Sequence, residues 1–158
     1  MQAIQRILCP TDFSECALVA LEQAWELARS FGATLDVLYV YHNPPFIAPE
    51  ITVGYASTAM GQTLAELMRN EAEAGMQEFG AKAAEKGITL SAQRVVYGDA
   101  ANTILDVAKN GNYDLIAMGT HGRTGLSHVL LGSVAERVLR RSERPVLTVR
   151  HTTEAAKH

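Results

Sequence analysis

The sequence predicts an α/β fold in which helices cover both faces of a five-stranded parallel sheet. Short apolar segments with the composition of strands alternate with segments that have helical periodicity. This alternation favours parallel strands joined by right-handed crossovers. The chain has 158 residues, the size of one domain. We therefore expect a single-domain, Rossmann-like three-layer sandwich with strand order 3-2-1-4-5.

The first three elements are a strand, a helix and a strand. Residues 4–9 form an apolar run that ends at a proline, so we expect a buried strand followed by a turn. Apolar residues then recur at helical spacing, which predicts a helix that Asp12 or Ser14 caps and Gly32 ends. Residues 34–41 are rich in β-branched and aromatic side chains, as is typical of a strand.

The middle of the chain combines an irregular segment, a long helix and a third strand. Residues 42–61 contain several prolines, and a loop of this length is usually functional or mobile. Residues 62–86 have helical periodicity, with Gly87 as the expected C-cap. Residues 88–97 predict the third strand. The expected buried face of the long helix consists of Leu64, Leu67, Met68, Ala72, Met76, Phe79 and Ala83.

The last part of the chain continues the alternation. Asp99 can cap a helix over residues 100–109, and the short apolar run 113–118 predicts the fourth strand. Residues 133–141 have helical periodicity, and residues 145–149 predict the fifth strand.

A glycine-rich turn after the fourth predicted strand carries the strongest functional signal. Gly119 and Gly122 leave the strand, and Gly132 and Ser133 open the next helix. Backbone N–H groups in such a turn can converge on an anion. Glycine suits these positions because a Cβ would block the ligand, and because we expect several of them to need a positive φ. The pattern predicts a phosphate-binding site.

The spacing of these glycines excludes two common phosphate motifs, the P-loop and the dinucleotide fingerprint. Each part of the turn also has a purely structural interpretation. Gly119 can end a strand, and Gly122 and Gly125 can serve turns. Ser133 can cap the helix in a capping box with Glu136. The combination favours a ligand, because parallel α/β sheets bind ligands at the switch point where strands one and four are neighbours.

Composition excludes several classes of protein. The net charge of −3 argues against a nonspecific nucleic-acid binder, and the arginines between residues 137 and 150 lie among Glu136 and Glu143, as on a solvated helix face. No apolar segment reaches the roughly 20 residues that span a membrane, and the N-terminus lacks a signal-peptide layout. Cys9 and Cys16 are too few for a disulfide scaffold. We expect a cytoplasmic protein with inert thiols (a redox pair is the less favoured alternative), without nucleic-acid or membrane partners.

Longer segments match one family. They are Cys-Pro-Thr-Asp-Phe-Ser after the first strand, Gly-Asp-Ala before the third helix, and Asp-Leu-Ile-Ala-Met-Gly-Thr-His-Gly-Arg-Thr-Gly-Leu around the glycine turn. The chain also meets in full the nucleotide motif G-2x-G-9x-G-[ST], at Gly119, Gly122, Gly132 and Ser133. On these segments the sequence resembles the ATP-binding branch of the universal stress protein family over residues 3–150. The resemblance implies one such domain over residues 1–150, and we expect a disordered tail over residues 151–158.

The resemblance also implies a site for ATP, with ADP or AMP as alternatives and with Mg²⁺ or Mn²⁺ beside the phosphates. The backbone of Val40 would bind the adenine edge, Asp12 would border the adenosine, and Ser133 would donate its hydroxyl to a phosphate. We expect no catalytic residue and no metal ligand from the protein itself. The expected cofactor-binding residues are Pro10, Thr11, Asp12, Val40, Met118, Gly119, His121, Gly122, Arg123, Gly132, Ser133 and Val134.

Three of these residues have a second interpretation. Asp12 can simply cap the first helix. His121 can contact ribose or phosphate, or can pack within the loop, and no carboxylate nearby in the sequence is placed to orient it as a base. Arg123 can clamp phosphates or point into solvent, and we favour the clamp.

The leading functional hypothesis is a cytoplasmic, ATP-binding stress-response protein that acts as a nucleotide-dependent switch or scaffold toward an unknown protein partner. A slow ATPase is the enzymatic alternative, since no clear base is evident. An interaction module without a nucleotide is the other alternative. Family members commonly pair through the last strand, so the resemblance implies a homodimer, with a tetramer as the larger alternative, through Val146–Val149.

Overall fold

The computed structural model describes residues 3–43, 52–53, 62–122 and 131–151. Its strands are β1 (Arg6–Thr11), β2 (Thr34–Tyr41), β3 (Thr52–Val53), β4 (Gln62–Thr63), β5 (Ala92–Tyr97), β6 (Leu115–Gly119) and β7 (Val146–Val149). Its helices are α1 (Glu15–Phe31), α2 (Leu64–Glu85), α3 (Ala100–Asn110) and α4 (Ser133–Arg141). Every predicted strand and helix is present, with its ends shifted by a few residues.

Five strands form one parallel sheet in the order β5-β2-β1-β6-β7. Counted along the chain, these strands follow the predicted order 3-2-1-4-5, so the predicted α/β fold is confirmed. One detail differs from the prediction. β3 and β4 form a separate antiparallel pair that we did not predict.

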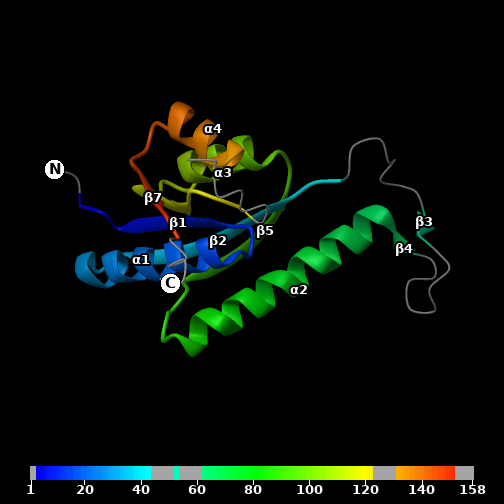
Figure 1. Ribbon diagram of the computed structural model, residues 1–158, viewed down its shortest axis with the longest axis horizontal. Helices are drawn as coiled ribbons and strands as arrows, with labels where there is room; N and C mark the ends of the chain where they lie inside the picture. Colours follow the sequence, from blue (N-terminus) through cyan, green and yellow to red (C-terminus); the bar gives the residue numbers. More distant parts are fainter. Residues whose placement is uncertain (1–2, 44–51, 54–61, 123–130, 152–158) are drawn as a thin grey trace, which may run out of the picture.

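Helices cover both faces of the sheet (Figure 1). α1 and α2 pack on one face, around a cluster of buried residues that includes Phe79. α3 and α4 pack on the other face, around a cluster that includes Ile104. Successive side chains of a strand point to opposite faces, so Ile7 and Cys9 enter the first cluster and Leu8 enters the second. The sheet therefore has two cores, one on each face.

Side-chain caps explain where two of the helices begin. Ser14 caps α1 by accepting a hydrogen bond from the N–H of Ala17, so Ser14 rather than Asp12 is the cap. Thr63 and Glu66 form a capping box at the start of α2. Gly32 ends α1 with a φ of 65°, a conformation that glycine adopts without strain.

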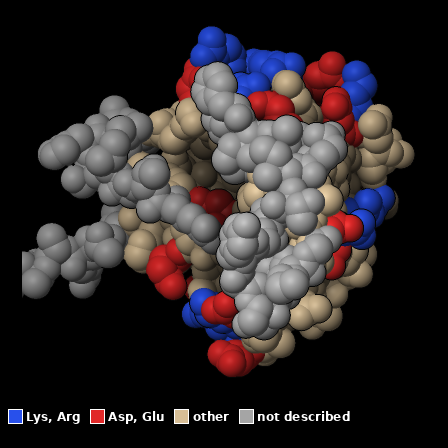
Figure 2. All heavy atoms as spheres, turned by 90° about the vertical axis from the view of Figure 1, so that its right-hand side faces the viewer, with Lys and Arg blue, Asp and Glu red and all other residues tan. Residues whose placement is uncertain are grey.

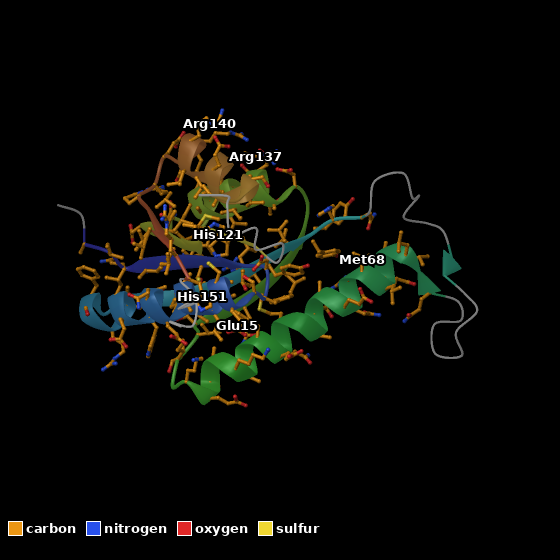
Figure 3. All side chains as sticks on the ribbon, in the orientation of Figure 1. Glu15, Met68, His121, Arg137, Arg140 and His151 are labelled. Carbon is orange, nitrogen blue, oxygen red and sulfur yellow. The ribbon has the colours of Figure 1, made fainter. Side chains whose placement is uncertain are left out.

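The first half of α2 is less buried than its apolar pattern predicts. The buried members of the predicted face are Ala72, Met76, Phe79 and Ala83. The remaining members, which are only half-buried, are Leu64, Leu67 and Met68. The amino-terminal end of α2 extends beyond the sheet toward β3 and β4 (Figure 1), and Met68 lies on this part (Figure 3). The sheet thus covers the helix only from about Ala72 onward.

Other boundaries also differ from the expected ones. β5 begins at Ala92 rather than at residue 88, and Lys86 rather than Gly87 is the C-cap of α2. β3 lies inside the segment that we expected to be irregular. Residues 44–51 and 54–61 of that segment, and the tail after residue 151, lie outside the described residues.

The arginines of α4 lie among acidic residues on the outer surface. Arg137 pairs with Asp99, and Arg140 pairs with Glu136. Figure 2 shows basic and acidic side chains together along its upper rim, and Figure 3 places Arg137 and Arg140 on α4. This mixture agrees with the predicted solvated helix face.

Both cysteines are free and buried. Burial raises the pKa of the Cys9 thiol to about 12, so the reactive thiolate of Cys9 is not formed at neutral pH. Within the described part of the chain, no helix has both the length and the apolar composition needed to cross a bilayer.

Candidate functional site

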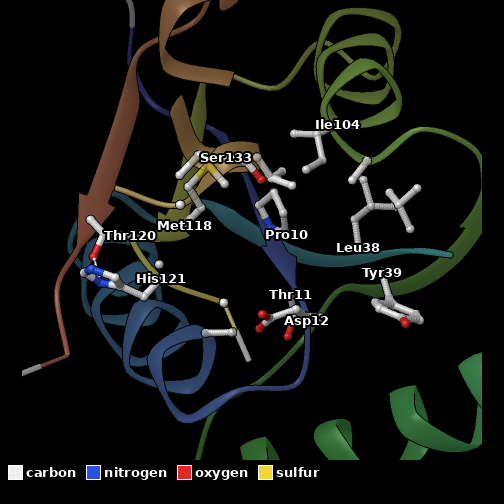
Figure 4. A pocket seen from close by; sticks show the side chains of 18 residues that line it. Pro10, Thr11, Asp12, Leu38, Tyr39, Ile104, Met118, Thr120, His121 and Ser133 are labelled. Atoms are coloured by element: carbon white, nitrogen blue, oxygen red, sulfur yellow. Dashed lines mark hydrogen bonds between the residues drawn. The ribbon is translucent and has the colours of Figure 1, made fainter. Parts of the chain in front are cut away.

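A cavity of about 210 Å³ lies at the carboxyl ends of β1, β2 and β6 (Figure 4). The strand order reverses between β1 and β6, and parallel α/β sheets bind ligands at such a point. The first turns of α3 and α4 complete the wall of the cavity. The fold therefore places a cavity where the glycine motif predicted a ligand.

All of the predicted site residues except Arg123 line this cavity. From β1 and the residue after it come Pro10, Thr11 and Asp12, and from β2 comes Val40. From the end of β6 and the turn after it come Met118, Gly119, His121 and Gly122, and from the start of α4 come Gly132, Ser133 and Val134. Arg123 lies outside the described residues.

The turn between β1 and α1 is held by side chains that bond to its own backbone. Thr11 Oγ1 accepts a hydrogen bond of 2.9 Å from the N–H of Phe13, and Asp12 Oδ1 accepts one of 3.0 Å from the N–H of Ser14. Such local bonds are typical of ST and Asx turns. The second carboxylate oxygen, Asp12 Oδ2, faces Gly122, where an added Cβ would lie 2.8 Å from it.

The motif glycines are required by close neighbours and not by their backbone conformation. A Cβ on Gly119 would lie 2.8 Å from Cys16 Sγ, and a Cβ on Gly132 would lie 3.1 Å from the carbonyl oxygen of Thr120. Gly119, Gly122 and Gly132 are not among the described residues with a positive φ. Our expectation that several motif glycines need a positive φ is therefore wrong for these three.

Thr120 joins three parts of the site although we did not predict it. Its N–H donates a 2.9 Å hydrogen bond to the carbonyl of Val149 in β7, and its own carbonyl accepts a 2.6 Å bond from the N–H of Gly132. Its Oγ1 lies 2.8 Å from His121 Nδ1, and the His121 ring lies beside it in Figure 4. With a relative exposure of 4%, Thr120 is buried.

Among the described residues, no side chain caps the start of α4. Gly132 is the N-cap and makes no side-chain capping bond. Ser133 is therefore not the N-cap, and the capping box that it could have formed with Glu136 is absent. The first N–H groups of an α-helix have no acceptor within the helix, and the helix dipole favours an anion there.

The two ends of the cavity differ in chemistry. Leu38, Val40 and Ile104 give one end an apolar lining, and the glycine turn and the start of α4 give the other end backbone amides. Among the described lining residues, Asp12 has the only carboxylate, and none is a lysine or arginine. No described group of three or more His, Cys, Asp or Glu side chains could hold a metal ion. This arrangement suits binding of a molecule with an apolar end and an anionic end.

Sequence reasoning missed several lining residues. Leu38 could have been found from Val40, because residues two apart on a strand share a face. Ala100 and Ile104 begin α3 after β5, and they follow from the predicted strand order together with the Asp99 cap. Thr120 has no signal of its own, since its role depends on bonds to Val149 and Gly132.

Comparison with known proteins identifies the family. The chain matches the universal stress protein family over residues 3–150. It is 35% identical over 146 residues to universal stress protein MJ0531 of Methanocaldococcus jannaschii, which covers 92% of this chain and 82% of that protein. The solved structure of MJ0577 from the same organism is 26% identical and has a TM-score of 0.76, with 97% of this chain and 100% of that chain covered.

A solved universal stress protein in complex with cAMP is also similar. It is 25% identical, with a TM-score of 0.67, and the match covers 94% of this chain and 98% of that chain. The family match extends over nearly all of the described residues, including the glycine motif and the cavity around it. The chain therefore belongs to the universal stress protein family.

Proposed function

We propose that the cavity binds an adenine nucleotide, namely ATP or alternatively ADP or AMP. The observation that carries this proposal is the convergence of the glycine turn, the start of α4 and an apolar wall in one cavity at the switch point. The family relative in complex with cAMP supports an adenine nucleotide as the class of ligand.

The chemistry of the cavity suggests how the ligand lies. The adenine occupies the apolar end, where the backbone of Val40 bonds to its edge and Leu38 and Ile104 contact its faces. The ribose lies near Met118, and Asp12 accepts bonds from the adenosine. The expected neighbours of the phosphates are Gly122, Arg123, Gly132, Ser133 and Val134. Because the described lining has no lysine or arginine, Mg²⁺ or Mn²⁺ bound with the nucleotide would offset the phosphate charge that Arg123 leaves.

The function is nucleotide-dependent switching or scaffolding in a cytoplasmic stress response. Fast phosphoryl transfer needs a positioned metal, an oriented water and cationic stabilisation of the leaving charge. The described lining offers Asp12, His121 and the start of α4, which suit binding better than turnover. The expected hydrolysis rate is not above about one per minute, far below the roughly one per second at the low end for enzymes.

A homodimer through β7 is the proposed assembly, with a tetramer as the larger form. β7 is an edge strand. The carbonyls of Pro145 and Val149 accept bonds from the N–H groups of Ile116 in β6 and of Thr120 directly after it. Backbone groups alternate in direction along a strand, so those of Val146 and Thr148 point away from the sheet. An antiparallel partner strand would pair with these outward groups.

Calorimetric titration of the protein with ATP and AMP at millimolar magnesium tests the proposed binding. Gly122→Val should weaken binding by more than about tenfold, because its Cβ meets Asp12, with the melting temperature as the check on folding. Ser133→Ala should weaken binding by about tenfold through loss of one bond to phosphate. Ser30→Ala, near the carboxyl end of α1, is the matched control. Absence of heat with every adenylate would refute the proposal.

A further inference from the structure

Phe13 has a backbone conformation that is rare for a bulky residue. It directly follows Asp12 in the turn between β1 and α1, and its φ is +66°. A non-glycine residue in this region is strained, and such strain persists only where the surroundings enforce it. Something in the structure must therefore hold Phe13 in place.

The aromatic ring of Phe13 is held by α2 and β2. Its centroid lies 4.2 Å from that of Tyr39 and 5.8 Å from that of Phe79. It also lies against Gly75 of α2, where an added Cβ would come within 2.6 Å of the ring atom Cε2. Gly75 thus provides the space that the ring occupies. Any larger residue at position 75 must displace a ring that also contacts Tyr39 and Phe79.

The ring and the Asp12 carboxylate are linked through a short, bonded backbone. The N–H of Phe13 bonds to Thr11, and the N–H of Ser14 bonds to Asp12 Oδ1. A shift of Phe13 therefore moves the peptide groups on both sides of it and reorients the carboxylate that faces Gly122.

α2 itself lies away from the cavity. It packs on one face of the sheet, whereas α3 and α4, which form part of the cavity wall, pack on the other face.

We infer that Phe13 is a positioning residue for the nucleotide site, and that Gly75 of α2 determines the position of Phe13 by leaving space for its ring. Through this contact α2 controls the orientation of Asp12, and hence the affinity of the cavity for the adenosine part of its ligand. The inference rests on the proposed adenine-nucleotide binding. It extends the site to a helix that does not line the cavity among the residues described there.

α2 offers a matched pair of substitutions to test this inference. Gly75→Ala and Gly80→Ala add the same methyl group to the same helix, and both favour the helix by removing a glycine. At position 80 the Cβ meets only the end of the Gln93 side chain, which is exposed and can turn away. Gly75→Ala should weaken AMP binding by about tenfold, while Gly80→Ala should leave it unchanged.

A double-mutant cycle shows whether the effect passes through the ring. Phe13→Gly keeps the turn free of strain at a positive φ but removes the ring. In the Phe13→Gly background, Gly75→Ala should cause no further loss of affinity. Equal affinities for Gly75→Ala and Gly80→Ala, or a loss that persists without the ring, would overturn the inference.

A readout without ligand separates this inference from the proposed function. The carboxyl ¹³C resonance of Asp12 in the free protein should shift in Gly75→Ala and not in Gly80→Ala. If the wild-type chain binds no adenylate, the proposed function fails, and this resonance still decides whether α2 positions Asp12. An unchanged Asp12 resonance in Gly75→Ala would overturn the positioning role.

Discussion

Tyr113 donates a 2.6 Å hydrogen bond to the carboxylate of Asp36 at the amino end of the sheet, opposite the cavity. Both residues are buried, with relative exposures of 0% and 3%. The Arg6 guanidinium completes the cluster, since it lies 3.2 Å from the same Asp36 oxygen and 4.5 Å from the centre of the Tyr113 ring. A buried carboxylate is tolerated here because it has both a neutral and a charged partner.

Tyr113→Phe should lower the free energy of unfolding by about 1–3 kcal/mol, because Asp36 keeps its burial and loses one hydrogen bond. Urea denaturation monitored by circular dichroism measures this change. Tyr97→Phe, at a side chain that is 58% exposed, is the matched control and should have no effect. Nucleotide affinity should not change in either variant, and equal stability of the two variants would contradict the prediction.

Stability should decrease at alkaline pH. Burial, helped by the hydrogen bond to Asp36, raises the pKa of Tyr113 to about 12 from an ordinary value of 10.0. The folded state therefore holds this proton more tightly than the unfolded state, so its contribution is complete below pH 10 and is lost as the pH rises toward 12. Cys9, with a pKa raised by burial to about 12, acts in the same direction.

Urea denaturation between pH 8 and pH 11 measures the alkaline effect. The decrease with pH should be smaller in Tyr113→Phe than in the wild type. A decrease of the same size in both proteins would show that Tyr113 does not contribute.

Arg137 should hold the pKa of Asp99 below its ordinary range. Its guanidinium bonds to both carboxylate oxygens, at 3.1 and 2.9 Å, and the N–H of Asn102 also bonds to Asp99. These bonds lower the pKa of Asp99, with the bond from Arg137 as the largest cause. The stabilisation is present above the ordinary pKa of aspartate and is lost as the pH falls through the lowered pKa.

An NMR titration of the Asp99 carboxyl group should show its pKa rise in Arg137→Gln. Arg140→Gln is the control, because Arg140 pairs with Glu136. High salt should reduce the difference, since both partners are partly exposed. The same Asp99 pKa in all three proteins would rule out this role for Arg137.

Thr148→Pro should prevent dimer formation if two copies pair through β7. Proline lacks the N–H that Thr148 directs away from the sheet, and an edge strand tolerates it. Thr148→Val keeps this N–H and should remain dimeric. Sedimentation velocity measures the assembly, and a dimer that persists in Thr148→Pro would exclude pairing through this strand.

The parts of the fold that were predictable are those with a local signal. Strands such as 34–41 are rich in β-branched residues, and the helices have apolar periodicity, so the element order and sheet order followed. β3 and β4 have two residues each, too few for any periodicity. The amino-terminal end of α2, near Met68, has an apolar pattern. It is only half-buried because the helix extends beyond the sheet there, and the local sequence does not indicate where the sheet ends.

In the candidate site, too, only the features with a local sequence signal were predictable. Gly119, Gly122 and Gly132 were found because they are close in the sequence and have a recognisable spacing. The reason for each glycine was not predictable, since the neighbours come from distant segments, such as Cys16 of α1 beside Gly119. The position of Phe13 against Gly75 was likewise hidden, because nothing in either local sequence indicates the other.

Thr120 connects the rim of the cavity to the edge strand β7, through its bonds to Gly132 and Val149. If a nucleotide binds in this cavity and two copies pair through β7, as proposed, both events would act on the backbone around Thr120, and thermodynamics makes any communication between them reciprocal. If a bound nucleotide tightens the contact between two copies by a given factor, then association tightens nucleotide binding by the same factor. The nucleotide affinity would in that case depend on the protein concentration, because dilution into single copies would weaken nucleotide binding by that factor.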